Sequence, residues 1–157
     1  MRGECSAKLP LLRGPSCWAM LHMTRSNFQY NSYKDFTTLD AWKKAREVKL
    51  FFYREVIPLL PREERFNLGV QLGRASVSVT ANISEGYGRY YHQESIRFYR
   101  IARGSMYELK DHITTCLDLK LIAKELFDRG IFLLEDAKKT LNGYIKFLKN
   151  NKGLITD

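Results

Sequence analysis

The chain has 157 residues, of which 45% are hydrophobic and 27% charged, a composition typical of one globular domain. Its 26 Lys and Arg residues outnumber 17 Asp and Glu residues, and the formal net charge of +9 favours polyanionic partners such as nucleic acid. No apolar run approaches the roughly 18 residues that span a bilayer, and Pro10, Gly14 and Pro15 interrupt the stretch most like a signal peptide, so we expect a cytoplasmic protein with no membrane partner.

Residues 1–35 differ from the rest of the chain. They mix Pro, Gly, Ser and Arg with scattered aromatic residues and show no hydrophobic period, which predicts a disordered or loosely attached extension. Met20 and Met23 are alternative starts, so the sequence leaves open whether residues 1–22 belong to the native protein.

The first predicted helix starts near residue 36. Apolar residues recur there at steps of three and four, which places them on one helix face. They are Leu39, Trp42, Ala45, Val48, Phe52 and Val56. Pro58 and Pro61 are expected to end this helix and open the next, because proline suits the first position of a helix.

The second predicted helix spans about 61–85 and has two faces that suit burial. The apolar face contains Leu68, Leu72, Ala75 and Val79, and the small-residue face contains Gly69, Gly73, Ser76 and Thr80. Small residues let a neighbouring helix approach closely, so this helix is expected to be central. We expect Gly86 to supply a left-handed C-cap, and Glu85 to pair with Arg89 across the following turn.

The third predicted helix, about 91–118, carries apolar residues in the alternation typical of a bundle seam. They are Tyr99, Ala102, Met106, Leu109, Ile113 and Cys116. Gly104 inside this helix costs about 1 kcal/mol relative to alanine, which predicts a close helix contact there.

The last predicted helix has its own apolar stripe. It consists of Ile131, Leu134, Ala137, Leu141, Ile145 and Leu148. Because residues 119–123 contain no Gly or Pro, periodicity also permits one continuous helix with the third. No segment shows strand alternation bounded by turn residues. The sequence therefore predicts an all-α, antiparallel up-down four-helix bundle over residues 36–152.

An up-down bundle would gather positive charge at the pole that holds the turn near residue 86 and the chain's last helical turns. Residues 86–103 contain four arginines and one glutamate, and residues 138–152 contain five lysines and no acid. The predicted nucleic-acid-binding residues are Arg74, Arg89, Arg97, Arg100, Arg103, Lys138, Lys139, Lys146, Lys149 and Lys152. Unpaired bases could stack on the nearby tyrosines, which are Tyr87, Tyr90, Tyr91 and Tyr99. The alternative is that the lysines only solvate the C-terminal helix.

No constellation in the sequence predicts catalysis, a metal or a cofactor. The loop that follows Gly86 comes after a helix and lacks the G-K-[ST] ending of a phosphate loop. His112 and Cys116 share a helix face, but two ligands are too few for a metal site. The three cysteines, Cys5, Cys17 and Cys116, have no ligand-like spacing and are expected to be reduced thiols. We therefore expect a protein that is not an enzyme.

One segment resembles a family signature. It runs from Gln71 to Arg89 and reads QLGRASVSVTANISEGYGR. Further matches to the same family pattern follow in order at residues 36–45, 94–98, 101–109 and 141–145. Over roughly residues 36–150 the chain resembles the four-helix-bundle proteins encoded in intervening sequences of bacterial 23S ribosomal RNA genes (S23-type). Two departures are Gly73, where the family often has a basic residue, and Tyr91, where a capping hydroxyl residue is common.

The resemblance implies an up-down bundle that commonly forms a homopentamer, a break between the third and fourth helices, and no established enzymatic activity. A more distant relative is the accessory variability protein of diversity-generating retroelements, which binds a reverse transcriptase and nucleic acid. Two functions follow as expectations. The first is a non-enzymatic, rRNA-associated RNA-binding accessory protein. The alternative is a ring-forming adaptor that binds a reverse transcriptase.

Self-association has support of its own in the sequence. Leu50, Phe51, Val70 and Val77 lie outside the main apolar stripes of the first two helices, so a monomer would expose some of them.

Overall fold

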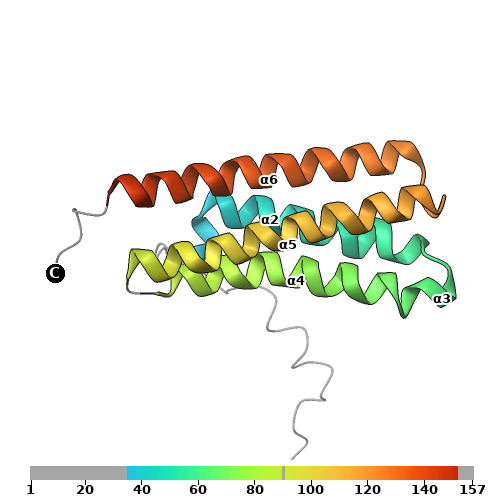
Figure 1. Cartoon of the computed structure of the whole chain (residues 1–157), viewed down its shortest axis with the longest axis horizontal. Helices are drawn as coiled ribbons and strands as arrows, with labels where there is room; N and C mark the ends of the chain where they lie inside the picture. Colours follow the sequence, from blue (N-terminus) through green and yellow to red (C-terminus); the bar gives the residue numbers. More distant parts are fainter. Residues whose placement is uncertain (1–34, 90, 152–157) are drawn as a thin grey trace, which may run out of the picture. The chain divides into compact units, whose positions relative to one another are not determined.

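The computed structural model describes residues 35–89 and 91–151, so residues 1–34 of the extension predicted over 1–35 lie outside this range. The described residues form an all-α, antiparallel up-down four-helix bundle, as predicted (Figure 1). Its elements are η1 (Phe36–Thr38), α2 (Asp40–Phe51), η2 (Phe52–Val56), η3 (Ile57–Leu59), α3 (Arg62–Arg65), α4 (Leu68–Tyr87), α5 (His92–Asp118) and α6 (Lys124–Asn150). Among the described residues, no helix is long and apolar enough to cross a bilayer.

The first long helix is α2 continued through the π-helical turn η2 and the 3-10 turn η3. Its predicted apolar stripe is confirmed, with Ala45, Val48, Phe52 and Val56 all buried. Pro58 lies inside η3, where the helix ends as predicted. Pro61 is the N-cap of α3 with an extended backbone, so the prediction that it opens a helix is off by one position.

The second predicted helix is divided into α3 and α4 at Phe66 and Asn67. The side chain of Arg65 stabilises the turn of the chain before α4. Its guanidinium donates to the carbonyl oxygens of Pro58 (2.8 Å) and Leu60 (2.9 Å), which the end of the first helix leaves without helical partners. The corner is therefore held by a side chain, and α4 begins only after it.

Small residues on α4 let the first helix approach closely, which confirms the prediction for this face. A Cβ on Gly73 would lie 3.3 Å from the hydroxyl of Tyr53, and one on Gly69 would lie 3.5 Å from Leu60 Cδ1. On the other side of α4, the hydroxyl of Ser78 lies 2.8 Å from that of Ser105 on α5.

The structure corrects two expectations about glycines. Gly86 is a helical residue of α4 with negative φ, and the helix ends at Gly88, so the predicted left-handed C-cap is wrong. Gly86 instead provides space, because a Cβ there would lie 2.6 Å from Tyr99 Cε1 and 3.0 Å from the carbonyl oxygen of Ser95. Gly104 is exposed, and a Cβ there would meet nothing within 4 Å, so the predicted close helix contact is also wrong.

Helices α5 and α6 bury the stripes that their periodicity predicted, although Ile131 is only partly buried. The break between them falls at residues 119–123, where Lys120 adopts φ of 56° and the backbone N–H of Leu121 donates to the carbonyl oxygen of Cys116 (2.8 Å). Tyr91 precedes α5 without a side-chain cap, as its departure from the family pattern predicted.

Candidate nucleic-acid interface

The turn between α4 and α5 and the end of α6 lie at the same pole of the bundle, as the topology predicted (Figure 1). The ring centroids of Tyr99 on α5 and Tyr144 on α6 are 5.4 Å apart. Three further contacts join α5 and α6: Arg103 with Asn142 at 3.1 Å, the Lys138 ammonium over the Tyr107 ring at 4.7 Å, and Lys110 with Glu135 at 3.1 Å. Along this series of contacts the residue number rises on α5 as it falls on α6, which is the register of two antiparallel helices. Arg97 and Arg100 therefore lie beside the last turns of α6.

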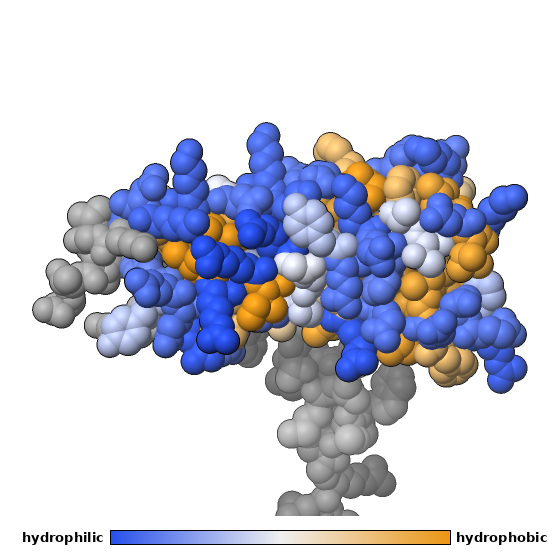
Figure 2. Space-filling model, viewed as in Figure 1, coloured by the Kyte–Doolittle hydropathy of each residue, from blue (hydrophilic) through white to orange (hydrophobic). Residues whose placement is uncertain are grey.

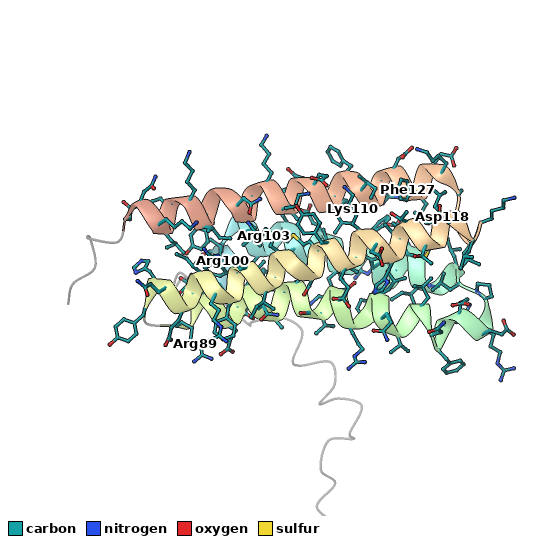
Figure 3. All side chains as sticks on the ribbon, viewed as in Figure 1. Arg89, Arg100, Arg103, Lys110, Asp118 and Phe127 are labelled. Atoms are coloured by element: carbon teal, nitrogen blue, oxygen red, sulfur yellow. The ribbon has the colours of Figure 1, made fainter. Side chains whose placement is uncertain are left out.

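This register brings together a set of basic side chains that we call the basic patch. It consists of Arg97, Arg100, Arg103, Lys139, Lys146 and Lys149. All are exposed except Arg103, which is half-buried and donates to a neutral amide, so its charge is not compensated. None of the six forms an ion pair with another described residue. Figure 3 shows Arg100 and Arg103 along α5, and Figure 2 shows strongly hydrophilic side chains over this end.

The structure places two other predicted binding residues in ion pairs. Arg89 pairs with Glu85, as predicted, and its guanidinium lies 4.7 Å from the Phe98 ring centroid. Lys138 lies 2.6 Å from Glu135, which also binds Lys110. Hydrogen bonds from these two lysines lower the pKa of Glu135, and the Glu135 carboxylate raises the pKa of Lys138. Lys138 therefore belongs to a compensated cluster with Glu135 and Lys110.

The remaining predicted residues do not join the basic patch. Arg74 lies on α4, where it lines a groove instead. Lys152 and Tyr90 lie outside the described residues.

Two of the tyrosines proposed for base stacking remain accessible. Tyr91 is 65% exposed and Tyr87 is 38% exposed, whereas Tyr99 is 1% exposed and belongs to the core. Burial raises the pKa of the Tyr99 hydroxyl. The exposed aromatic that the sequence reasoning missed at this pole is Phe147, which is 58% exposed on α6. The one feature of the sequence that could have indicated Phe147 is its position among the C-terminal lysines.

The groove that contains Arg74 lies between α4 and the end of the first helix, with a volume of about 740 Å³. Its lining residues include Tyr53, Ile57, Gly73, Val70 and Val77. Val70 and Val77 are 44% and 46% exposed, which confirms that these two lie outside the core. Phe51 is buried, and a Cβ on Gly130 would lie 2.9 Å from its ring, so Phe51 is not among the residues that a monomer exposes. Leu50 is half-buried.

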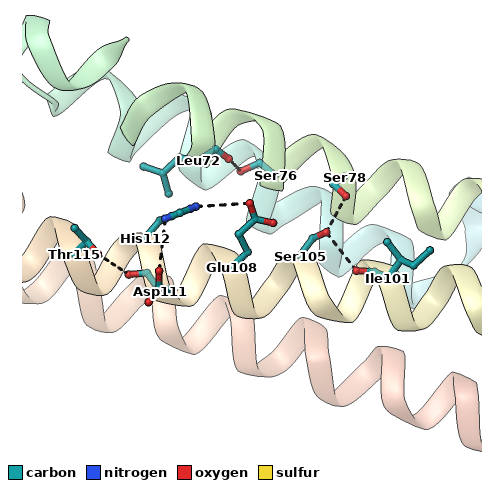
Figure 4. A network of polar contacts seen from close by, with 9 residues as sticks. All are labelled: Leu72, Ser76, Ser78, Ile101, Ser105, Glu108, Asp111, His112 and Thr115. Atoms are coloured by element: carbon teal, nitrogen blue, oxygen red, sulfur yellow. Dashed lines mark hydrogen bonds and ion pairs between the residues drawn. The ribbon is translucent and has the colours of Figure 1, made fainter. Parts of the chain in front are cut away.

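The polar contacts around His112 involve carboxylates of its own helix (Figure 4). Its ring nitrogens lie 3.7 Å from Glu108 and 3.8 Å from Asp111, and both carboxylates are on α5. Within the described ranges, no three His, Cys, Asp or Glu side chains converge as metal ligands. Cys116 is a buried free thiol, and burial raises its pKa to about 11.

Comparison with known proteins identifies a sequence family and a fold. The sequence model of a family described as "23S rRNA-intervening sequence protein" matches residues 37–143. The structure is similar to that of a protein of unknown function from the S23 ribosomal protein family of Bacteroides thetaiotaomicron, with a TM-score of 0.62 and 20% sequence identity. The alignment covers 68% of this chain and 98% of that one, and at this identity it supports the fold alone. No curated protein matches the chain.

Proposed function

The chain belongs to the 23S rRNA-intervening sequence protein family, and on that premise we propose that it is a non-enzymatic RNA-binding accessory protein, associated with ribosomal RNA in the cytoplasm. The observation that carries the proposal is the basic patch. Six cations from two antiparallel helices lie in the half of the α5–α6 face that ends at the α4–α5 turn, and no described acidic side chain forms an ion pair with any of them.

Uncompensated surface cations favour a phosphate backbone because binding releases the counterions that the backbone has condensed. The patch spans two helices, so it can contact several phosphates at once. Each contact makes the affinity more dependent on salt, with a slope of roughly −0.7 per phosphate for single strands.

The proposal is tested by measuring RNA binding by fluorescence anisotropy between about 50 and 200 mM salt. Arg100→Gln with Lys146→Gln should weaken binding and lower the salt slope. Arg62→Gln with Lys124→Gln removes the same charge at the opposite pole, so this control should bind like the wild type. Absence of RNA binding at low salt, or binding that salt does not affect, would overturn the proposal.

The second part of the proposal is self-association, with the homopentamer that the family resemblance implies as the expected form. It is supported by the groove on α4, where Val70 and Val77 are exposed beside Gly69 and Gly73. Exposed apolar residues in one groove suit burial against a second chain, whereas Gly69 and Gly73 are themselves buried against the first helix. The basic patch lies on α5 and α6, so assembly through α4 would leave it accessible.

The same groove favours one alternative function, a ring-forming adaptor that binds a reverse transcriptase in a diversity-generating retroelement. An apolar groove suits a protein partner better than it suits a phosphate backbone. Gene neighbourhood separates the two functions. A position inside a ribosomal RNA gene favours the RNA-binding accessory, and an adjacent reverse transcriptase gene favours the adaptor.

A further inference from the structure

Three aromatic rings form a series that runs from the core to the surface at the basic pole. Tyr99 is buried, and Tyr144 packs against it edge to face, with an interplanar angle of 60°. Phe147 then lies nearly parallel to Tyr144, with centroids 6.3 Å apart and an interplanar angle of 13°. Phe147 is nevertheless 58% exposed. A ring that is supported on one side and open to solvent on the other is oriented before any ligand arrives.

The course of α6 leaves this ring uncovered by the first helix. Lys44 on α2 lies 3.0 Å from Asp136 on α6, and α2 begins only at Asp40. The two helices are antiparallel, so the last turns of α6 continue beyond the start of α2, as Figure 1 shows. One turn before Phe147, Gly143 is exposed, and a Cβ there would meet nothing within 4 Å. The helix surface beside the ring therefore has room for a flat group.

The charge around the ring indicates what that group is. Helical geometry places Lys139, Gly143 and Lys146 on one side of α6, within about 100° of Phe147 around the helix axis. Both lysines are exposed, and residues 138–152 contain no acidic residue. A flat apolar ring attached to negative charges matches this surface, and an unpaired nucleobase with its phosphates is such a ligand.

We propose that Phe147, supported by Tyr144, is a stacking platform for an unpaired base of single-stranded RNA, with Lys139 and Lys146 contacting the adjacent phosphates. The inference rests on the proposed RNA binding and adds to it a preference for unpaired over paired RNA. In a duplex the bases are stacked on each other, so a paired RNA can reach the lysines but cannot use the ring. The protein should therefore prefer single-stranded or looped RNA to duplex RNA of equal charge.

The test compares two RNA probes with the full-length protein. One is a single strand of about 12 nucleotides with 2-aminopurine near its centre, and the other is a blunt-ended duplex without a loop, compared at equal phosphate concentration. Phe147→Ala should weaken single-strand binding roughly 5- to 100-fold, the effect of losing one base–aromatic stack. It should leave duplex binding unchanged. Phe147→Trp should retain the preference and quench the 2-aminopurine fluorescence on binding.

Phe132→Ala is the matched control, because Phe132 is 69% exposed on the same helix but far from the basic pole. It should bind both probes like the wild type. Salt-dependent binding of both probes with equal affinity, unchanged in Phe147→Ala, would overturn the stacking platform and leave the proposed function standing. Absence of binding to either probe would overturn the proposed function as well.

A further outcome would also count against the platform. If Phe147→Ala weakened both probes equally and lowered the unfolding midpoint, the ring would serve the fold and not the ligand. Tight binding of polyglutamate that Phe147→Ala weakens would show that the surface takes an acidic peptide instead.

Discussion

A methyl group on Gly86 would lie 2.6 Å from Cε1 of Tyr99, closer than two non-bonded carbon atoms can approach unless one of the helices or the ring moves. The glycine on α4 therefore makes room for the buried ring on α5. Tyr99 in turn supports Tyr144, which stacks with Phe147 at the surface. A residue without a side chain thus helps to determine the position of an exposed ring on another helix.

Gly86→Ala should destabilise the protein by about 1–3 kcal/mol, the usual cost of overpacking a core. The new methyl group also approaches the backbone carbonyl of Ser95 at 3.0 Å, so a side-chain rotation alone cannot relieve the contact. Urea unfolding followed by circular dichroism measures the effect. An unchanged midpoint would show that α4 and α5 can separate at no cost.

Gly104→Ala should have the opposite effect and stabilise the protein by up to about 1 kcal/mol. Gly104 lies inside α5 with open space around the position of a Cβ, so alanine gains helix propensity without a clash. The same urea titration tests it. Destabilisation would indicate that another chain packs on this face, because the described residues leave it open.

Cys116 should make stability depend on pH in the alkaline range. Its pKa is raised by burial from an ordinary value of 9.0 to about 11, so the folded state disfavours the thiolate. The resulting stability is fully present below about pH 9 and is lost as pH rises towards 11. Wild type should therefore lose about 2–3 kcal/mol more than Cys116→Ala over this interval. Parallel pH profiles for the two proteins would contradict the burial of the thiol.

Val77→Lys should reduce the assembled mass seen by light scattering at micromolar concentration without unfolding the bundle. Val77 is 46% exposed in the α4 groove, where a lysine would place a charge in the proposed interface. Ile101→Lys is the matched control, because Ile101 is 45% exposed but lies outside that groove. A monomeric wild type, or equal masses for all three proteins, would count against self-association through α4.

The helices and their buried faces could be predicted from the sequence because helical periodicity is a local property. The stripe from Tyr99 to Cys116 is buried as its three- and four-residue spacing predicted. The segment from Gln71 to Arg89 indicated the family, and up-down topology then placed the two basic segments at one pole. None of these inferences required knowing which residues of different helices touch.

The tertiary structure decided what depends on register between helices. Gly86 faces the Tyr99 ring on α5, and this close contact, rather than a turn, is the reason that the position requires glycine. Lys110 on α5 lies within reach of Glu135 on α6, whereas Arg97 and Arg100, beside the end of α6, form no ion pair with another described residue. Phe147 is exposed because α6 extends past the start of α2. Periodicity specifies which face of a helix is buried, but only the packed bundle determines which charges pair between helices and which ring remains open.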